Sequence, residues 1–466
     1  MKNAEKSLLL RRNMEKRANF GSKMGALLAS AGSAVGLANV WRFPMEVGEH
    51  GGAAFILVYV LCVLLIGMPV MISEFIIGRH THSNGVDAYR RLAPRSGWVA
   101  QGYLGVFVSW FILCYYSVVA GWTFRYLLTS LSGRLTRIGD SAAYFETFTS
   151  GVGGPLLFTF LALLITHAIV TRGVQKGIER FSKVMMPLLL LLVLFLGIYS
   201  LFMSGAHEAL VFLFHPDFSK VTADTVLSAM GQAFFSLSLG MGCLTTYASY
   251  FSSSTNLSRT AVSVAGIDTL VAVLSGLIIF PAVFTIGGSV SGSGPGLAFI
   301  TLPNVFRIAF VDAPWLGILF AALFYLLLVL SALTSTISIH ETATAFFHDH
   351  GLSRRASARI VTAVCMVFGT LCALSFGVLK NVKPFFGMTF FDFFDFFSAK
   401  FILPISGLLI SLFVGWRLDK KLVRDEFSNH GALATPLFGL LRFLLRWFVP
   451  IAILLVFLNE LGLLSR

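Results

Sequence analysis

Long apolar runs dominate the sequence and decide what the chain can fold into. About eleven of them are long enough to cross the hydrocarbon core of a bilayer as a helix. They occupy 24–45, 53–78, 100–131, 153–171, 182–203, 225–251, 261–287, 314–347, 357–376, 386–416 and 436–463. Since 56% of the 466 residues are hydrophobic and 12% are charged, a soluble core cannot absorb this much apolar surface. The sequence therefore predicts an all-α polytopic membrane protein.

The charged residues lie mainly in short segments between the apolar runs. The formal net charge of +13 is not accompanied by a nucleic-acid-binding motif, so no nucleic-acid partner is expected. Lys and Arg are concentrated in the tail at 1–23 and in every second loop after it. By the positive-inside rule, the tail is cytoplasmic, and an odd number of spans places the C-terminus outside. We expect a multi-pass protein of the cell (inner or plasma) membrane.

The sequence offers little that resembles catalytic or metal-binding chemistry. All five cysteines lie in or at the edge of apolar runs, without a CxxC or Cys/His pattern. The stretch "HETAT" at 340–344 begins like a zinc-protease motif, but Thr344 replaces the second histidine. No nucleophile–base pair can be identified, so we do not expect an enzyme.

Two of the apolar runs are interrupted by residues that weaken a membrane helix. The first contains "SAGSAVGLANVWRFP" at 30–44, and the sixth contains "FFSLSLGMGCLTTY" at 234–247. Taken alone, Gly32 and Gly36 form a small-xxx-small pair that also suits close helix packing. An arginine within a span, here Arg42, favours a water-filled cavity or a charged partner. Glycine-interrupted spans in corresponding positions of two halves indicate the binding site of an inverted-repeat transporter.

Seven motifs, in order along nearly the whole chain, resemble the neurotransmitter:sodium symporter family, and in particular its bacterial amino-acid transporters. They are "GSAVGLANVWRFP" (32–44), "GMPVMISEFIIGR" (67–79), "CYYSVVAGW" (114–122), "GIERFSKVMMP" (177–187), "GQAFFSLSLGMGCLTTYASY" (231–250), "SALTSTISIHE" (331–341) and "FFDFFDFFSAKFILP" (390–404). The resemblance implies one transporter domain over 1–466, with a 5+5 inverted-repeat fold and broken first and sixth helices. The first repeat would cover 24–203 and the second 225–416, with one additional C-terminal span at 436–463.

The resemblance also implies two sodium sites. The first would use the Ala34 carbonyl, Asn39, Ser236 and Asp268, together with the carboxylate of the substrate. The second would use the carbonyls of Gly32, Val35 and Ser331 and the hydroxyls of Thr334 and Ser335. Small hard cations need several oxygen ligands, and unwound backbone supplies them without added charge.

The substrate site implied by the resemblance carries no formal charge. Monoamine transporters of the family place an aspartate where this chain has Gly36, so an α-carboxylate is the expected anchor. A neutral, apolar amino acid, aliphatic or aromatic, is favoured because a charged side chain would be unpaired in the pocket. Ala38 departs from the glycine that is commoner beside the carboxylate. The implied site comprises Ala34, Gly36, Leu37, Ala38, Ile112, Tyr116, Phe235, Ser236, Ser238, Met241 and Ile339.

Asp268 lies in the apolar run "VSVAGIDTLVAVLSGLIIF" and needs a counter-charge if it is to stay ionised. Chloride-dependent relatives carry a neutral residue here. The carboxylate resembles that of bacterial members in which it replaces chloride. We therefore expect chloride-independent transport.

Gates and supports follow from the same resemblance. Asp395 is expected to approach Arg42 and close the outside, and Glu74 is expected to accept hydrogen bonds from unwound backbone amides of the first span. Gly177 and Pro187 flank a stretch that unwinds in relatives. The stretch 296–310 is too short to span and is expected to form a re-entrant or capping hairpin. The cytoplasmic latch would comprise Arg17, Ser249, Tyr250 and Asp349.

The predicted function is sodium-coupled symport of a neutral amino acid into the cell by alternating access. The sodium gradient would supply the energy, since the chain has no nucleotide-binding motif. Two alternatives remain open at this point: a proton-coupled or exchanging transporter of a related inverted-repeat family, and a non-transporting amino-acid-binding or receptor protein. The expected partners are two sodium ions, the amino acid and the lipid bilayer, with the protein a monomer or homodimer.

Overall fold

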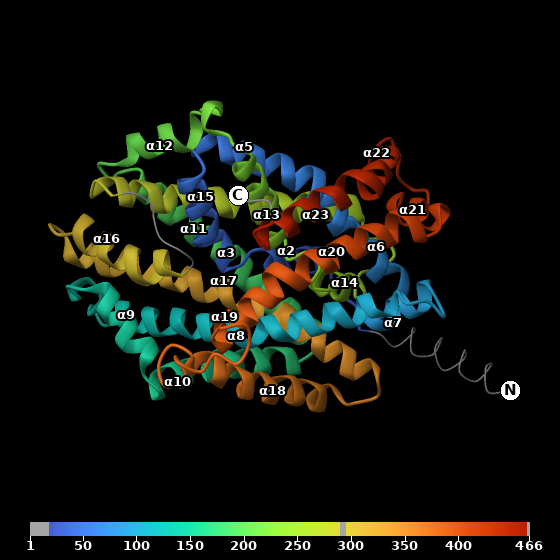
Figure 1. Cartoon of the computed structure of the whole chain (residues 1–466), viewed down its shortest axis with the longest axis horizontal. Coiled ribbons are helices and arrows are strands. Elements are labelled where there is room, and N and C mark those ends of the chain that lie inside the picture. The colour runs from blue at the N-terminus through green and yellow to red at the C-terminus, as the bar shows by residue number, and fades with distance from the viewer. Residues whose placement is uncertain (1–17, 289–294, 464–466) are drawn as a thin grey trace.

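The computed structural model describes residues 18–288 and 295–463, and in these residues the chain forms helices and no β-strand. Within these two ranges, nine continuous helical segments are long and apolar enough to cross a membrane, and one bent helix pair makes a tenth. Most of the long helices run broadly along the long axis of the molecule (Figure 1). The prediction of an all-α, multi-span fold is confirmed.

The helices fall into three groups along the chain. Those before residue 201 are α2 (Lys23–Ala34), α3 (Leu37–Val40), α4 (Arg42–Glu49), α5 (Ala53–Cys62), η1 (Val63–Gly67), α6 (Met68–Thr81), α7 (Gly85–Leu92), α8 (Val99–Leu131), η2 (Leu135–Arg137), α9 (Ser141–Ser150), α10 (Gly153–Thr171), η3 (Val174–Glu179) and α11 (Arg180–Ser200). Those between 201 and 350 are α12 (Ala206–Phe214), η4 (Phe218–Lys220), α13 (Ala223–Ser236), α14 (Cys243–Ala248), α15 (Leu257–Thr285), η5 (Leu297–Thr301), α16 (Leu302–Ala309) and α17 (Pro314–Asp349). The last are α18 (Arg354–Leu374), α19 (Phe390–Asp395), η6 (Phe396–Ile402), α20 (Leu403–Leu412), η7 (Phe413–Arg417), α21 (Lys420–Phe427), α22 (Phe438–Phe443), η8 (Leu444–Phe448) and α23 (Val449–Glu460).

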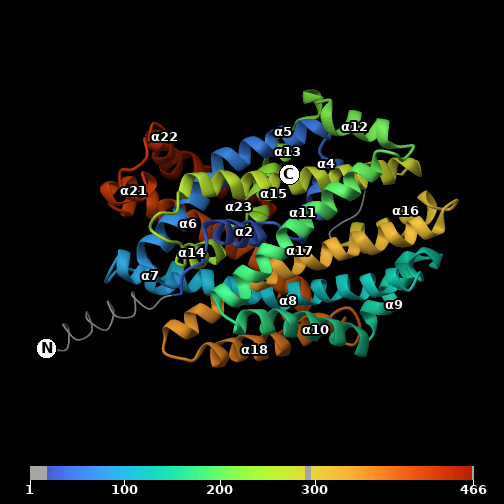
Figure 2. The same cartoon turned by 180° about the vertical axis from the view of Figure 1, so that it is seen from behind.

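The two ends of the molecule carry different short helices. Helices α9, α12 and α16 lie at one end, and α7, α21 and α22 lie at the other, as both views show (Figures 1 and 2). We refer to these as the α12 end and the α21 end.

Helix α11 shows why lipid must complete this fold. Leu191, Phe195 and Ile198 recur with helical spacing along one face and are at least half exposed, whereas Val193 and Leu196 on the other face are buried. A helix that is apolar on both its buried and its exposed face is stable only where lipid hydrocarbon covers the exposed face.

The first break lies at Val35 and Gly36, between α2 and α3. The chain is extended at Gly36, and the helices on either side, Lys23–Ala34 and Leu37–Glu49, are bent by 62°. Asn39 stabilises the start of the second half-helix, because its Oδ1 accepts a hydrogen bond from the Gly36 amide at 2.9 Å. The predicted interruption of the first span is confirmed.

The second break separates α13 from α14 and is held by Glu74 of α6. Ser238, Gly240 and Gly242 all have positive φ, which ends the helix. Glu74 is fully buried; its Oε1 accepts from the Gly240 amide at 2.8 Å, and its Oε2 accepts from the amide and hydroxyl of Thr245. The predicted break in the sixth span is confirmed. The prediction that Glu74 supports the first span was wrong, because its partners belong to the sixth.

Two shorter segments differ from, or add to, the sequence predictions. Leu297–Ala309 forms one short apolar helix and not a hairpin. The stretch between Gly177 and Pro187 is helical throughout, within the segment Val174–Ser200. A Cβ at Gly177 would lie 2.1 Å from the Ile169 carbonyl oxygen, so this glycine permits a close approach of α10.

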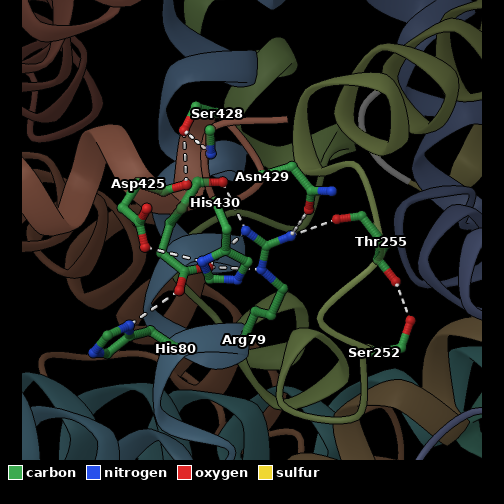
Figure 3. A network of polar contacts seen from close by, with 10 residues as sticks. Arg79, His80, Ser252, Thr255, Asp425, Ser428, Asn429 and His430 are labelled. Carbon is green, nitrogen blue, oxygen red and sulfur yellow. Dashed lines mark hydrogen bonds and ion pairs between the residues drawn. The ribbon is translucent and has the colours of Figure 1, made fainter. Parts of the chain in front are cut away.

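At the α21 end, Arg79 joins three segments that are far apart in sequence. Its guanidinium donates to the Glu426 carboxylate, with Nε to Oε2 at 2.7 Å, and to Asn429 Oδ1 at 2.9 Å. It also donates to the Thr255 carbonyl (Figure 3). Both members of the ion pair are buried, and His80 Nδ1 lies 3.0 Å from the other oxygen of Glu426. The contact fixes α21 against the end of α6.

We expect Glu426→Gln to lower the free energy of unfolding by about 1.5–3 kcal/mol, the range for hydrogen bonds to charged groups. Burial alone raises the pKa of Glu426, but the hydrogen bond from His80 and the charge of Arg79 outweigh it, so that pKa lies below its usual value of 4.5. A depressed carboxyl pKa contributes stability above 4.5 that is lost as the pH falls through the lowered value. The deficit of the variant should therefore shrink in acid, as the pH falls through the lowered pKa of Glu426.

The control for this prediction is Asp425→Asn, one residue away. Asp425 pairs with His430 at 2.9 Å, and both side chains are about half exposed. An exposed pair contributes about 0–1 kcal/mol, so its loss should change the thermal midpoint little. Equal effects of the two variants on thermal unfolding in detergent would contradict the role of Arg79 and Glu426 in fixing α21.

Candidate functional site

A cavity of about 510 Å³ lies beside the first broken helix. Leu37, Ala38, Tyr116 and Phe235, all predicted substrate residues, are among its lining side chains. Arg42, Glu46, Asp395, Lys400 and Glu460 also line it and give it a charged portion. Lys400 and Glu460 form an ion pair at 3.1 Å across the cavity wall.

At the first break, the backbone lies close to polar side chains near the cavity. The Leu37 amide donates to the Tyr116 hydroxyl at 3.1 Å. A Cβ at Gly36 would lie 2.9 Å from Ser335 Oγ and 3.4 Å from the Tyr116 hydroxyl. There is no free space for a side chain at position 36, so the carboxylate that monoamine carriers place there could not be accommodated without displacement of Ser335.

Three of the four residues predicted for the first sodium site, Asn39, Ser236 and Asp268, form one buried cluster. Asn39 Nδ2 donates to Asp268 Oδ1 at 2.7 Å and to Ser236 Oγ at 3.1 Å. The Ser236 hydroxyl donates to Asp268 Oδ2 at 2.8 Å. All three side chains are buried, and they come from α3, α13 and α15. The cluster therefore joins both broken helices to the Asp268 carboxylate.

The residues predicted for the second sodium site also lie together, between α2 and α17. The hydroxyls of Thr334 and Ser335 are each 3.4 Å from the Val35 carbonyl oxygen. Thr334 Oγ1 is also 2.9 Å from the Ser331 carbonyl oxygen. A Cβ at Gly32 would lie 3.3 Å from the Thr334 Cβ, so this part of α2 packs directly on α17.

The other predicted substrate residues do not line the cavity in this structure. Ile112, Met241 and Ile339 are buried in the core. The Ser238 hydroxyl donates to the Ser33 carbonyl at 2.9 Å, which links the two broken helices. Ala34, at the end of α2, is buried as well.

The predicted outer gate is not closed by a direct ion pair. Arg42 and Asp395 line the same cavity, but among the described ion pairs Arg42 contacts Glu46, at 3.5 Å and one helical turn away. The guanidinium lies 4.8 Å from the centre of the Phe235 ring. Arg42 thus has two partners on the cavity wall other than Asp395.

At the predicted inner latch, Ser249, Tyr250 and Asp349 each contact a neighbouring segment. The Phe20 amide donates to the Tyr250 carbonyl at 3.0 Å, and the Phe20 ring packs edge-on against that of Tyr250. Asp349 Oδ2 accepts from the backbone and side-chain amides of Asn84. The Ser249 carbonyl contacts His82 Nδ1 at 3.1 Å. The fourth predicted member, Arg17, lies outside the described residues.

Two contributors were not predicted from the sequence. Tyr59 donates to Asp268 Oδ2 at 3.3 Å, and its only sequence signal is a tyrosine in an apolar run. Glu341, which ends the motif "SALTSTISIHE" but was given no role, binds Arg354 at 2.6 Å and accepts from the Tyr250 hydroxyl. Within the described residues, no group of three or more His, Cys, Asp or Glu is arranged to hold a metal ion.

Known proteins resemble this chain over most of its length. A model of the sodium:neurotransmitter symporter family matches residues 17–147 and 145–464. YhdH of Bacillus subtilis, described as a sodium-dependent transporter, is 40% identical over 457 residues, which cover 97% of this chain and 99% of that relative. A sodium-dependent transporter of Methanocaldococcus jannaschii is 32% identical, over 89% of this chain and 84% of the relative.

A solved structure is similar over almost the whole fold. The crystal structure of MhsT in complex with L-phenylalanine matches with a TM-score of 0.85 and 41% sequence identity. The match covers 95% of this chain and 100% of that chain.

Proposed function

Since the chain belongs to the sodium:neurotransmitter symporter family, we propose that it couples the entry of sodium to the uptake of a neutral, apolar L-amino acid. The chain is a membrane transporter and not an enzyme. The observation that carries the proposal is the buried cluster of Asn39, Ser236 and Asp268 beside the cavity, because it places a carboxylate and two polar side chains where both broken helices meet.

Sodium is a cosubstrate with two sites. At the second site, the 3.4 Å separation of the Val35 oxygen from each hydroxyl is long for an O–H···O hydrogen bond, which is usually about 2.5–3.0 Å. Oxygen ligands of Ca²⁺ lie about 2.3–2.6 Å from the ion. Two such oxygens that subtend a right angle at the ion would be about 3.3–3.7 Å apart. Na⁺ has nearly the same radius, so the spacing of these oxygens suits it.

At the first site, Asp268 supplies the negative charge and Ser236 a hydroxyl oxygen. Asn39 directs its amide nitrogen at both and its oxygen at the Gly36 amide, so sodium binding requires this side chain to turn its oxygen toward the ion and release that amide. The amide oxygen and nitrogen differ only by a rotation of the terminal group. Because the carboxylate already balances a bound cation, transport needs no chloride.

The amino acid is anchored by its α-carboxylate at the first sodium, the backbone amides near Leu37 and the Tyr116 hydroxyl. No side chain is present at Gly36 to bind an amine, and the predicted side-chain pocket carries no formal charge. MhsT, the similar solved structure, was crystallised with L-phenylalanine, which is a neutral and apolar amino acid. If the substrate carboxylate completes the first sodium site, each ligand must raise the affinity of the other by the same factor.

Transport proceeds by alternating access, with the N-terminus cytoplasmic and the C-terminus outside. The cavity with Arg42 and Asp395 is the outer vestibule, and the contacts around Phe20 and Tyr250 close the cytoplasmic side. Each gate uses small contacts that can open in every cycle. The protein works as a monomer or homodimer.

A thermal-shift screen of the twenty amino acids, in sodium and in potassium, tests this proposal. Neutral apolar amino acids should raise the unfolding midpoint in sodium only, by mass action on the folded state. Stabilisation that is equal in potassium would contradict sodium coupling. Stabilisation by charged amino acids alone would contradict the substrate class.

A further inference from the structure

The junction between the last two spans carries a cluster of basic and aromatic side chains that the transport site does not use. Span ten ends in η7 with Trp416 and Arg417, and the last span begins in α22 and η8 with Arg442 and Arg446. The two segments are in contact, because the Arg446 Nε in η8 donates to the Gly415 carbonyl in η7 at 2.7 Å. Both segments lie at the α21 end.

The two arginines of the last span are not neutralised by carboxylates. Among the ion pairs of the described residues, none involves Arg442 or Arg446. Asp419 attracts the charge of Arg442 but forms no ion pair with it among the described contacts, and it caps α21 by accepting from the Lys421 amide at 2.9 Å. Nearby acidic side chains of α21 are occupied elsewhere, since Glu426 binds Arg79.

Exposed apolar side chains run beside the arginines on the same helix. Leu440, Phe443 and Trp447 are each at least half exposed. Trp447 packs edge-on against Trp416 at 4.9 Å, and the Arg446 guanidinium lies 4.9 Å from the centre of the Trp416 ring. Tryptophan of this kind is typical of the water–lipid boundary, and arginine at that depth reaches the level of the lipid phosphates.

We propose that Arg442 and Arg446, flanked by Trp416 and Trp447, form a binding site for the headgroup of an anionic phospholipid. The guanidinium groups bind the phosphate, for which their planar donors are suited, and the acyl chains lie along Leu440, Phe443 and Trp447. A soluble anion would leave the apolar stripe uncovered, and a neutral lipid would leave the arginines without a net counter-charge. The basic side chains of Arg417 and Lys420 add attraction for an anionic leaflet.

The test measures binding of phosphatidylglycerol and phosphatidylcholine to the delipidated full-length protein by native mass spectrometry. We expect the wild type to bind phosphatidylglycerol more tightly than phosphatidylcholine. The double variant Arg442→Gln with Arg446→Gln should lower the affinity for phosphatidylglycerol on the order of 30-fold and change the affinity for phosphatidylcholine little. Arg355→Gln with Arg359→Gln is the matched control. It removes two exposed arginines, also four residues apart and at the start of α18, and should leave binding unchanged.

Three outcomes would overturn the proposal. Equal binding of phosphatidylglycerol by the wild type and the Arg442/Arg446 variant would exclude the site. Equal losses in both double variants would show that general surface charge is responsible. Competition by inorganic phosphate at millimolar concentration would indicate a soluble anion site. Should the double variant fail to fold, Arg442→Gln alone gives the same test, because no hydrogen bond of the described structure involves that side chain.

Discussion

Replacing Asp268 with asparagine is expected to weaken sodium-dependent amino-acid binding by about 100-fold or more, because it removes the charge from a fully buried carboxylate cluster. The substitution preserves shape but not hydrogen bonding. Asp268 now accepts from Asn39 on one oxygen and from Ser236 on the other. An asparagine would turn an NH₂ donor toward one of these two donors.

The measurement is a sodium titration of radiolabelled L-phenylalanine binding to the purified variant. Ser275→Ala is the matched control, since Ser275 is buried in the same helix and its hydroxyl bonds only to the Val271 carbonyl one turn away. That variant should bind like the wild type. A sodium dependence that is unchanged by Asp268→Asn would remove the carboxylate from the coupling mechanism.

Alanine at position 36 is expected to weaken amino-acid binding by about 10- to 100-fold through overpacking. The added methyl group would lie 2.9 Å from Ser335 Oγ and 3.4 Å from the Tyr116 hydroxyl. Ser335 can yield only by turning its hydroxyl away from the Val35 carbonyl, and Tyr116 only by leaving the Leu37 amide. One methyl group thus disturbs the proposed second sodium site and the proposed carboxylate anchor together.

Gly266→Ala provides the control for this prediction. Gly266 lies in α15, where a Cβ would have no heavy atom within 4 Å, and alanine favours a helix over glycine by up to about 1 kcal/mol. It should bind normally and be as stable as the wild type or more so. Equal binding by both glycine variants, measured as L-phenylalanine affinity in saturating sodium, would show that position 36 tolerates a side chain.

The sequence was sufficient for features that depend on local composition. Ten of the eleven predicted spans correspond to membrane-length helical segments of the described residues, and the predicted span at 225–251 does not. The two breaks follow from glycine and polar residues within the apolar runs. The stretch around Gly32 and Gly36 predicted two half-helices, and the structure has them on either side of Val35. The sixth span was recognised in the same way, although α13 and α14 are individually too short to span.

Features that depend on distant packing were not predictable. Arg79 and Glu426 are 347 positions apart, and nothing in either neighbourhood indicates the other. Glu74 was assigned to the wrong broken helix because a buried carboxylate shows only that it needs donors, not which segment supplies them. Arg42 was expected to pair with Asp395. It instead forms an ion pair with Glu46, which lies one turn along the same helix and can be reached without any rearrangement.

The central claim is that sodium drives amino-acid accumulation through this site. Uptake of radiolabelled L-phenylalanine into proteoliposomes, with an inward sodium gradient, chloride replaced by gluconate and no pH gradient, tests it most directly. We predict that L-phenylalanine accumulates inside the proteoliposomes above its external concentration. This accumulation should be lost when the internal potassium is replaced by sodium, which abolishes the sodium gradient. Uptake driven by a pH gradient alone, exchange without sodium, or binding that never leads to accumulation would contradict the account.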